Sequence, residues 1–400
     1  MTDLILNPGA HLGLAAGHPW IMAKDVARTH GRAAPGSTVD VRDHDGNFLA
    51  RAAISPSSKI RARVWHRDPD VSVDHAWFKA RIAAAQARRL TAYTGALPGA
   101  YRLVNAEGDG LPGVTIDRYG DVLVAQLTAC GADKWRDAIV QAAVAATGCA
   151  HVFERSDAAV REQEGLERTS GCLAGDPTIG TREAPLEIFE GAARFLVDVQ
   201  TGHKTGFYLD QAQNRQLAAR LAPGKAVLNC FSYTGGFGLA AAAAGASRVV
   251  NIDSSAPALA LGEQAAAGQG YAAALEWLRS DVKKALASLA EQGTQRFDLV
   301  IMDPPKLAPT QSSKRKAMKL YEDLNARAMG LLNPGGSLLS FSCSGAVSLG
   351  DFRQMLAGAA ARSGREVAAL QVLGSGPDHP GHPTLSGSGY LKGLWLQAID

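Results

Sequence analysis

Cysteine is scarce in this 400-residue sequence. The five cysteines are widely spaced, and no two of them form a Cys-x-x-Cys pair. Their odd number and scattered positions exclude a disulfide-stapled scaffold and argue against a structural zinc site. We therefore predict no metal centre and a reducing, cytoplasmic location, in which single cysteines remain available for chemistry.

Long apolar runs are also absent. The richest stretch, residues 239–246, is a short alanine-rich segment that could not span a bilayer. Residues 1–4 show neither the basic region nor the apolar region of a secretory signal. We therefore expect no membrane partner. Hydrophobic residues still form 46% of the chain, which is enough for the cores of two or three domains.

Neither sign of charge dominates, because 41 Lys and Arg residues face 38 Asp and Glu residues. Such a balance excludes neither nucleic acid nor an acidic substrate, so a basic surface has to be local. In a strand predicted over residues 59–67, one face carries four cations and an aromatic residue: Lys59, Arg61, Arg63, Trp65 and Arg67. That face would contact phosphates and stack a base of RNA. A solvated edge strand protected by its charges is the alternative.

Turn signals divide the first half of the sequence into two small regions. Strands predicted over residues 39–42 and 48–54 flank an Asp-Gly pair, which is a strong hairpin signal. Apolar residues at helical spacing predict a helix over residues 74–89, after a boundary near residue 70. Residues 101–190 mix predicted strands with one helix, which indicates a compact α+β region.

Strands and helices alternate after residue 220. The predicted strands span residues 226–231, 248–252, 297–302 and 337–341, and the predicted helices span residues 237–244, 256–267 and 324–332. This alternation predicts an α/β fold with a parallel, doubly wound, Rossmann-like sheet. Right-handed crossovers would bring the carboxyl ends of the strands to one edge, where ligands bind.

A glycine-rich turn, residues 232–238, follows the first of these strands. Its glycines let the backbone approach a ligand closely, although the spacing is not G-x-G-x-x-G. Asp253 ends the second strand and could accept both ribose hydroxyls of an adenosine cofactor. These two features fit a methyl donor and NAD equally well.

Asp281 lies where the third strand should end. Its carboxylate is placed to accept a hydrogen bond from an adenine amino group. It is equally well placed to cap a helix over residues 282–289, and the two roles are compatible.

The sequence Asp303, Pro304, Pro305, Lys306 directly follows the apolar strand over residues 297–302. Successive prolines stiffen the exit from this strand and fix the carbonyl groups, which offers a rigid rim against a planar base. A dehydrogenase has no need of that loop, whereas a purely structural turn is the alternative. The basic residues between 314 and 319 are expected on a connecting loop that grips nucleic acid or stays solvated.

Cys343 differs from the other cysteines, which we interpret as small core residues. It lies just beyond the last predicted strand, where the sheet ends and a pocket should begin. A thiolate there could add to C6 of a pyrimidine, so that C5 becomes nucleophilic enough to take a methyl group, and loss of the C5 proton would release the cysteine. We hypothesise that a protonated Asp303 donates to N3 of cytosine as the adduct forms.

Together these segments resemble the bacterial 23S rRNA (cytosine-C5) methyltransferases of the large-subunit type. The matching stretches run nearly from end to end of the chain: residues 17–20, 108–113, 154–157, 202–211, 229–237, 303–306 and 341–344. The resemblance implies a PUA domain over residues 1–70, an α+β middle domain over 71–185 and a Rossmann-like class I methyltransferase domain over 186–400.

The resemblance also implies a set of site residues. Cys343 would be the nucleophile, assisted by Asp303. S-adenosyl-L-methionine would be bound by Phe231, Ser232, Tyr233, Thr234, Gly235, Gly236, Asp253, Asp281 and Asp303. RNA would be contacted by Pro304, Pro305, Lys306, Lys204, Tyr208, Asp210, Gln211, Lys59, Arg61 and Arg63. An ordinary glycine-turned hairpin is the alternative for residues 204–211.

The implied activity is formation of 5-methylcytosine in 23S rRNA through a cysteine adduct at C6. The alternatives are another RNA or base, a non-catalytic RNA-binding factor that retains the donor fold, and an NAD-linked oxidoreductase. Another class of RNA cytosine-C5 enzymes carries a second cysteine where Pro305 stands here, so the base that removes the C5 proton is unassigned. The sequence does not identify the target cytosine. It also leaves open whether the substrate is naked rRNA or a large-subunit assembly intermediate, and whether the protein forms a homodimer.

Overall fold

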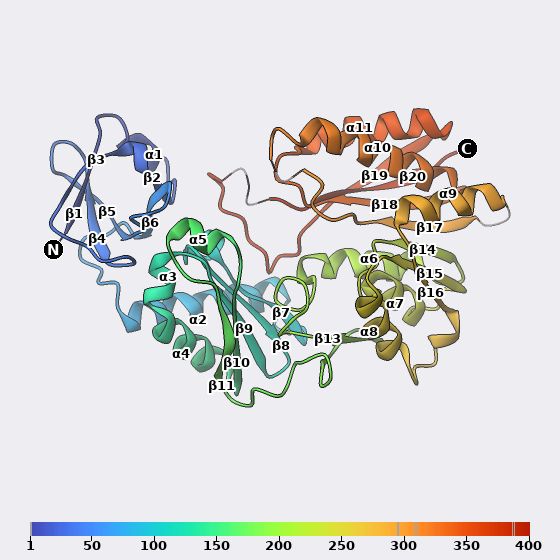
Figure 1. Cartoon of the computed structure of the whole chain (residues 1–400), viewed down its shortest axis with the longest axis horizontal. Helices are drawn as coiled ribbons and strands as arrows, with labels where there is room; N and C mark the ends of the chain where they lie inside the picture. Colours follow the sequence, from blue (N-terminus) through green and yellow to red (C-terminus); the bar gives the residue numbers. More distant parts are fainter. Residues whose placement is uncertain (1, 294–295, 309, 386, 388) are drawn as a thin grey trace. The chain divides into compact units, whose positions relative to one another are not determined.

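The chain folds into two compact units, each assembled from several stretches of sequence (Figure 1). A computed structural model describes residues 2–293, 296–308, 310–385, 387 and 389–400. One unit comprises Met1–Leu186, Val197–Leu209 and Pro377–Ser388, and the other comprises Glu187–Leu196, Asp210–Gly376 and Gly389–Asp400. No helix in the described part of the chain is long and apolar enough to cross a membrane.

The first unit begins with a six-stranded sheet in the order β2-β6-β5-β4-β1-β3. Its elements are β1 (Asp3–Leu6), α1 (His11–Ala15), β2 (Trp20–Met22), the 3-10 helix η1 (Ala23–Asp25), β3 (Val26–His30), β4 (Thr38–Arg42), β5 (Phe48–Ile54) and β6 (Ile60–His66). The predicted hairpin is confirmed, because β4 and β5 pair antiparallel around the Asp-Gly turn. Apolar residues such as Leu4, Val41 and Ala62 are fully buried in the core of this sheet.

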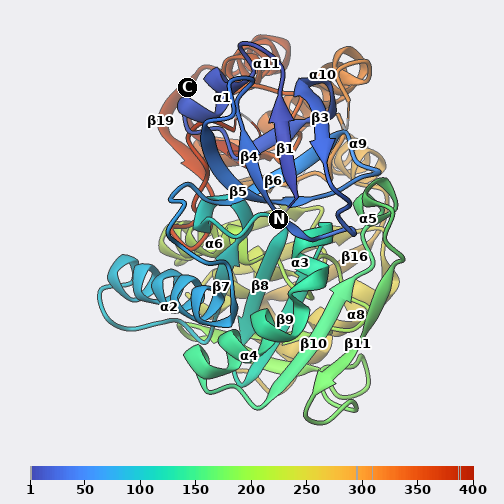
Figure 2. The same cartoon turned by 90° about the vertical axis from the view of Figure 1, so that its left-hand side faces the viewer.

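The rest of the first unit is a five-stranded sheet in the order β11-β10-β9-β8-β7. Its elements are α2 (His75–Ala92), β7 (Ala100–Asn105), η2 (Ala106–Asp109), β8 (Val114–Tyr119), β9 (Val122–Leu127), α3 (Cys130–Lys134), α4 (Arg136–Thr147), β10 (His151–Ser156), α5 (Val160–Glu164) and β11 (Thr169–Ala174). Figure 2 shows α3 and α4 lying across the strands. Asp74 caps α2 by accepting from the Trp77 amide, and the predicted apolar face of α2 is buried at Phe78, Ile82 and Ala85.

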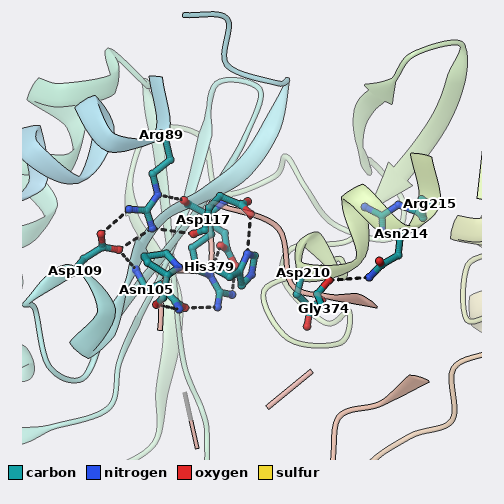
Figure 3. Close-up of polar contacts among 12 residues, drawn as sticks. Arg89, Asn105, Asp109, Asp117, Asp210, Asn214, Arg215, Gly374 and His379 are labelled. Atoms are coloured by element: carbon teal, nitrogen blue, oxygen red, sulfur yellow. Dashed lines mark hydrogen bonds and ion pairs between the residues drawn. The ribbon is translucent and has the colours of Figure 1, made fainter. Parts of the chain in front are cut away.

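A network of buried charges crosses the first unit (Figure 3). The Arg89 guanidinium, 1% exposed, donates to the Asp109 carboxylate and to the backbone carbonyl of Asp378. The Asp378 carboxylate in turn accepts from the amide of Arg102, at 3.0 Å, and contacts the His379 ring at 2.9 Å. Residues from the segment Pro377–Ser388 are therefore built into the core of a unit that begins at the N-terminus.

The second unit contains a seven-stranded sheet in the order β16-β15-β14-β17-β18-β20-β19. Its strands are β14 (Ala226–Cys230), β15 (Arg248–Asp253), β16 (Leu275–Arg279), β17 (Phe297–Met302), β18 (Leu332–Ser342), β19 (Val367–Gly374) and β20 (Lys392–Ala398). Strands β14 to β18 pair in parallel, and β20 runs antiparallel to both β18 and β19. The predicted doubly wound α/β fold is confirmed.

Helices cover both faces of this sheet (Figure 1). They are α6 (Ala212–Leu221), α7 (Gly236–Ala243), α8 (Ala256–Ala266), α9 (Val282–Gln292), α10 (Lys314–Gly330) and α11 (Leu349–Ser363), with the 3-10 helices η3 (Leu209–Gln211) and η4 (Ala272–Ala274). One apolar core lies between the sheet and α9, α10 and α11, and another lies under α6 and α7. The two-stranded sheet of β12 (Leu186–Glu190) and β13 (Ala193–Val197) precedes α6.

The structure corrects one predicted segment. The basic residues between 314 and 319 do not form a connecting loop, because α10 begins at Lys314, ten residues before the predicted helix start. Lysine and arginine have high helix propensity, and Ala317 and Tyr321 supply a buried face that holds these turns on the sheet. The basic side chains of this segment therefore project from a rigid helix.

Candidate active site

The predicted cofactor and catalytic residues meet at one edge of the seven-stranded sheet. Strands β15, β14, β17 and β18 are parallel neighbours, so their carboxyl ends lie side by side. The glycine-rich turn follows β14, Asp253 is the last residue of β15, Asp303 follows β17 and Cys343 follows β18. This edge is where doubly wound sheets bind their ligands.

The turn after β14 has an unusual backbone. Phe231, Tyr233 and Gly235 have φ angles of 58°, 52° and 78°, so three of five consecutive residues lie in the left-handed region. Non-glycine residues in this region store strain of about 1–3 kcal/mol each, which concentrates at functional sites. Gly235 cannot be replaced easily, because a Cβ atom there would lie 2.5 Å from Cη2 of Trp277.

Asp253 holds this turn in place. Its two carboxylate oxygens accept hydrogen bonds from the amides of Tyr233 and Ser255, each at 2.8 Å. A carboxylate has about four acceptor sites, so these bonds leave capacity for further donors such as ribose hydroxyls. Asp253 therefore orients the turn and presents acceptors at the sheet edge.

Two hydroxyl groups of the turn are buried without partners. Ser232 Oγ and Thr234 Oγ1 find no hydrogen-bond partner among the residues that the structure describes. An unpaired buried hydroxyl costs about 1–3 kcal/mol, so a structure that keeps two of them within one turn is built for a polar ligand. These hydroxyls, the strained turn and Asp253 fit an adenosine cofactor with polar groups on its ribose and amino acid moieties.

The variants Ser232→Ala and Thr234→Val test this interpretation. Each is expected to leave the melting temperature of the ligand-free protein unchanged or slightly higher, because it removes an unsatisfied polar atom. Each should weaken S-adenosylmethionine binding about fivefold, which calorimetric titration measures. The exposed Ser247 offers a control, since Ser247→Ala should change neither quantity. Lower melting temperatures with unchanged donor affinity would assign the hydroxyls to the fold instead.

Asp281 adopts the capping role that the sequence left open. Its side chain accepts from the Lys284 amide at 3.0 Å and caps α9. The residue is exposed, so its carboxylate also reaches solvent at the sheet edge. A contact with adenine stays a prediction.

Asp303 is hydrogen-bonded by Gln211, a residue that we predicted to contact RNA. Its Oδ2 accepts from Gln211 Nε2 at 3.0 Å, and Gln211 Oε1 accepts from Asn214 Nδ2 at 2.6 Å. Asn214 also donates to the carbonyl of Gly374 on β19, as Figure 3 shows. Asp210 accepts from the Tyr390 hydroxyl at 2.6 Å.

These contacts correct the expectation that Asp210 and Gln211 touch RNA directly. Both side chains are only 2% exposed, because α6 and the segment before β20 enclose them. Gln211 instead orients the Asp303 carboxyl group. Asn214 and Tyr390 were not predicted, and nothing in the local sequence marks them, because their partners lie 160 and 180 residues away.

The loop that carries Cys343 is fixed by buried hydroxyls. Cys343 itself is partly exposed, whereas Ser342, Ser344 and Tyr321 are fully buried. Ser342 donates to the Tyr321 hydroxyl at 3.0 Å, and that hydroxyl lies 3.1 Å from Ser344 Oγ. Ser344 Oγ also accepts from the Ala308 amide, which ties this loop to the one after Asp303. Burial raises the pKa of Tyr321, so its hydroxyl stays neutral.

Lys204 and Tyr208 belong to an anchored turn of the first unit. Thr205 is fully buried, donates to Asp117 at 2.6 Å and lies 2.8 Å from the Tyr119 hydroxyl, so the turn is fastened to β8. Lys204 has a left-handed φ of 55°, and its ammonium group lies 4.4 Å from the centre of the Tyr208 ring. The buried hydrogen bonds of Thr205 and the left-handed backbone of Lys204 therefore distinguish this turn from an ordinary glycine-turned hairpin.

The predicted basic face of β6 is only partly present. Lys59 is exposed, and the half-buried Arg61 donates to the Pro56 carbonyl. Arg61 also lines a surface cavity of about 460 Å³ with Arg28 and Thr29. Arg28 was not predicted, because the pattern of β3 gave no strand signal.

Arg63 and Trp65 do not lie on a solvent face, and this part of the prediction is wrong. Arg63 is 7% exposed and donates two hydrogen bonds of 2.9 Å to Glu164 of α5. Trp65 packs against Phe78, with the ring centres 5.4 Å apart. Burial alone would raise the pKa of Glu164, but the guanidinium outweighs it and keeps the pKa below its ordinary value. Arg63 is therefore a structural partner of α5 and unavailable to RNA.

Comparisons with known proteins agree with this geometry. A family model for S-adenosylmethionine-dependent methyltransferases matches residues 158–396, and a PUA-like domain model matches residues 4–67. A solved structure of a protein from Streptococcus mutans, described as a SAM-dependent methyltransferase, superposes with a TM-score of 0.81 at 23% identity, covering 99% of this chain and 100% of that one. A second solved structure, described as a methyltransferase in complex with SAH, superposes with a TM-score of 0.83 at 23% identity over the same shares. At this identity the likeness shows the fold.

Curated relatives match over almost their whole length. Ribosomal RNA large subunit methyltransferase I of Erwinia tasmaniensis is 43% identical over 400 residues, which cover 99% of each chain. The proteins of the same name from Shewanella denitrificans and Escherichia coli are 44% and 42% identical, with 97% and 98% of each chain covered. The chain therefore belongs to the S-adenosylmethionine-dependent methyltransferases, within the family of ribosomal RNA large subunit methyltransferase I.

Proposed function

We propose that the chain methylates C5 of a cytosine in 23S rRNA, with Cys343 forming a covalent bond to C6. The observation that carries the proposal is the position of Cys343. Its partly exposed thiol follows β18, at the same sheet edge as the strained turn and Asp253, on a loop fixed by buried hydroxyls. Relatives at about 43% identity are named for large-subunit ribosomal RNA, which supports the substrate class.

The donor site in this proposal is the turn of Phe231, Ser232, Tyr233, Thr234, Gly235 and Gly236, together with Asp253, Asp281 and Asp303. Asp253 accepts from the ribose hydroxyls, and the buried hydroxyls of Ser232 and Thr234 receive the partners that they lack. Bound S-adenosylmethionine supplies an electrophilic methyl group. The chain's own contribution is to hold the acceptor carbon in line with that group.

Cys343 activates the base. Its thiolate sulfur bonds to C6, and the electrons of the C5–C6 double bond move to C5 while N3 takes up a proton. Asp303, in its protonated form, provides that proton, and Gln211 sets the orientation of its carboxyl group. After C5 has gained the methyl group, a base removes the C5 proton, the C5–C6 double bond forms again as the C6–S bond breaks, and N3 returns its proton to Asp303.

RNA contacts in this proposal come from three regions. Pro304, Pro305 and Lys306 form a rim beside Asp303, and Lys204 and Tyr208 extend from the anchored turn. Lys59 and Arg61 supply cations from the PUA-like region. We propose that this region spans residues 1–70, that a middle domain spans residues 71–185 and that the catalytic domain spans residues 186–400. Phosphate contacts of this kind should make RNA binding weaken steeply with salt.

The product decides between this proposal and its alternatives. Purified protein would be incubated with methyl-labelled S-adenosylmethionine and 23S rRNA that lacks the modification, followed by nucleoside mass spectrometry and bisulfite sequencing. We expect 5-methylcytosine at one position, with 16S rRNA as the control substrate. Running naked 23S rRNA beside immature large subunits identifies the preferred substrate. A methyl group on guanine or on an exocyclic amino nitrogen would overturn the proposal.

A further inference from the structure

Lys392 places a buried ammonium group beside the Cys343 loop. It is the first residue of β20 and pairs across the antiparallel ladder with Ser342, the residue before Cys343. The side chain is only 8% exposed. Its Nζ donates to the carbonyl oxygens of Ser344 and Val347, each at 2.7 Å. Both hydrogen bonds therefore go to the loop that follows Cys343.

The charge of this lysine lacks an adjacent counterion. Buried lysines usually pair with a carboxylate, because an isolated charge is costly to remove from water. Among the described residues, no carboxylate lies at ion-pair distance from Lys392 Nζ. The carboxylate whose charge acts on it, Asp351, is itself paired with Lys314 at 2.7 Å. Burial lowers the pKa of Lys392, whereas Cys343 and Asp351 act in the opposite direction.

We propose that Lys392 is a positioning residue for the Cys343 nucleophile. Its hydrogen bonds fix residues 344–347, and its positive charge favours the thiolate of Cys343 over the thiol. The proposal rests on the proposed function, because only a nucleophilic Cys343 needs its thiolate. In this proposal β20 positions and activates the Cys343 thiol, which neither the donor-site residues nor the RNA-contacting residues do.

A nearby positive charge makes a cysteine such as Cys343 more reactive. Tyr321 of α10, which interacts with Cys343, is a neutral hydroxyl, and the negative charge of Asp351 of α11, which acts on Lys392, is balanced by Lys314. An ordinary cysteine has a pKa of about 8.5, so only a few per cent is thiolate at pH 7. A cation held in a low-dielectric position next to the sulfur raises this fraction.

Alkylation of Cys343 in the RNA-free protein tests the proposal. The rate with iodoacetamide would be followed against pH by peptide mass spectrometry, with the half-buried Cys172 as internal reference. In the unaltered protein we expect the midpoint for Cys343 to lie below that for Cys172. Lys392→Gln, which keeps a donor but removes the charge, should raise the Cys343 midpoint by about one pH unit and slow alkylation at pH 7 about tenfold. Lys392→Arg should keep the midpoint.

Methyl transfer gives a second readout. Lys392→Gln should lower kcat about tenfold at pH 7 with little change in KM for RNA, and raising the pH should restore part of the loss. An unaltered midpoint in Lys392→Gln, or a Cys343 midpoint at or above that of Cys172 in the unaltered protein, would overturn the proposal. If Cys343→Ala still methylates RNA, the proposed function fails, and the alkylation midpoints still decide whether Lys392 favours the thiolate.

Discussion

Replacing Cys343 by alanine is expected to reduce methyl transfer to 23S rRNA by about 10⁴-fold or more, the scale seen when a covalent nucleophile is removed. The reason is chemical, because C5 of cytosine is a weak nucleophile until a group adds to C6. Donor binding should change less than twofold, since the turn after β14 and Asp253 do not include the thiol. Transfer of labelled methyl groups and calorimetric titration with S-adenosylmethionine measure the two quantities.

Cys172→Ala is the matched control for this experiment. Cys172 is a partly exposed thiol on β11 of the other unit, so its loss should leave methyl transfer unchanged. RNA substituted with 5-fluorocytosine adds a direct test, because fluorine cannot leave C5 as a proton does and the adduct persists. A donor-dependent, denaturant-resistant complex should form with the natural protein and not with Cys343→Ala. Methyl transfer by Cys343→Ala at a normal rate would exclude the covalent mechanism.

Asp109→Asn is expected to lower the free energy of unfolding by about 3–5 kcal/mol. The Asp109 carboxylate is buried and accepts from Arg88 and Arg89, each at 2.7 Å, and from the Asn105 amide at 2.6 Å. An amide in its place would leave the buried Arg89 guanidinium without a counterion, as the network in Figure 3 makes clear. Urea and thermal unfolding followed by circular dichroism give the measurement.

An exposed ion pair offers the control for Asp109→Asn. Glu162 and Arg168 lie 2.8 Å apart with side chains 61% and 50% exposed, so Glu162→Gln should cost less than about 1 kcal/mol. Equal losses in the two variants would show that the buried network contributes no more than a surface pair.

Acid should remove the advantage of Asp109 over asparagine. Burial alone would raise the pKa of Asp109, but the hydrogen bonds and charge of Arg89 outweigh it and lower the pKa below its ordinary value. A carboxyl group with a lowered folded-state pKa stabilises fully above its unfolded pKa of about 3.9, and this contribution is lost as the pH falls through the folded value. The stability difference between the natural protein and Asp109→Asn should therefore be constant near pH 7 and shrink below about pH 4.

Much of the catalytic sheet was predictable because its signals are local. The strands β14 and β17 are buried on both faces and read as short apolar runs. Asp303 directly follows one predicted strand, and Cys343 lies two residues after another. Parallel pairing then brings the ends together without further information. The positions of the candidate donor turn and of the proposed nucleophile at one sheet edge could therefore be predicted before the fold was known.

What the sequence did not reveal depends on distant partners. Arg63 reads as a surface cation in an alternating strand, yet it meets Glu164, 101 residues away, and becomes buried. Lys392 is the first residue of β20 and Tyr390 lies just before it, and the sequence of β20 has no distinctive pattern. Most of β19 is at least partly exposed, so its sequence reads as a loop. Local periodicity reports which side of an element is apolar, and not which element will cover it.

The segment Pro377–Ser388 has a consequence for how the protein is made. Arg89 and Asp378 are 289 residues apart, and both belong to the unit that contains the first 186 residues. During synthesis, this unit has its Arg102 amide and its Arg89 guanidinium incompletely paired until almost the whole chain has left the ribosome. Contacts of such long range are slow to form, because the loop must close before they stabilise anything. The unit that contains residues 1–186 therefore cannot be completed until residues 377–379 have been translated.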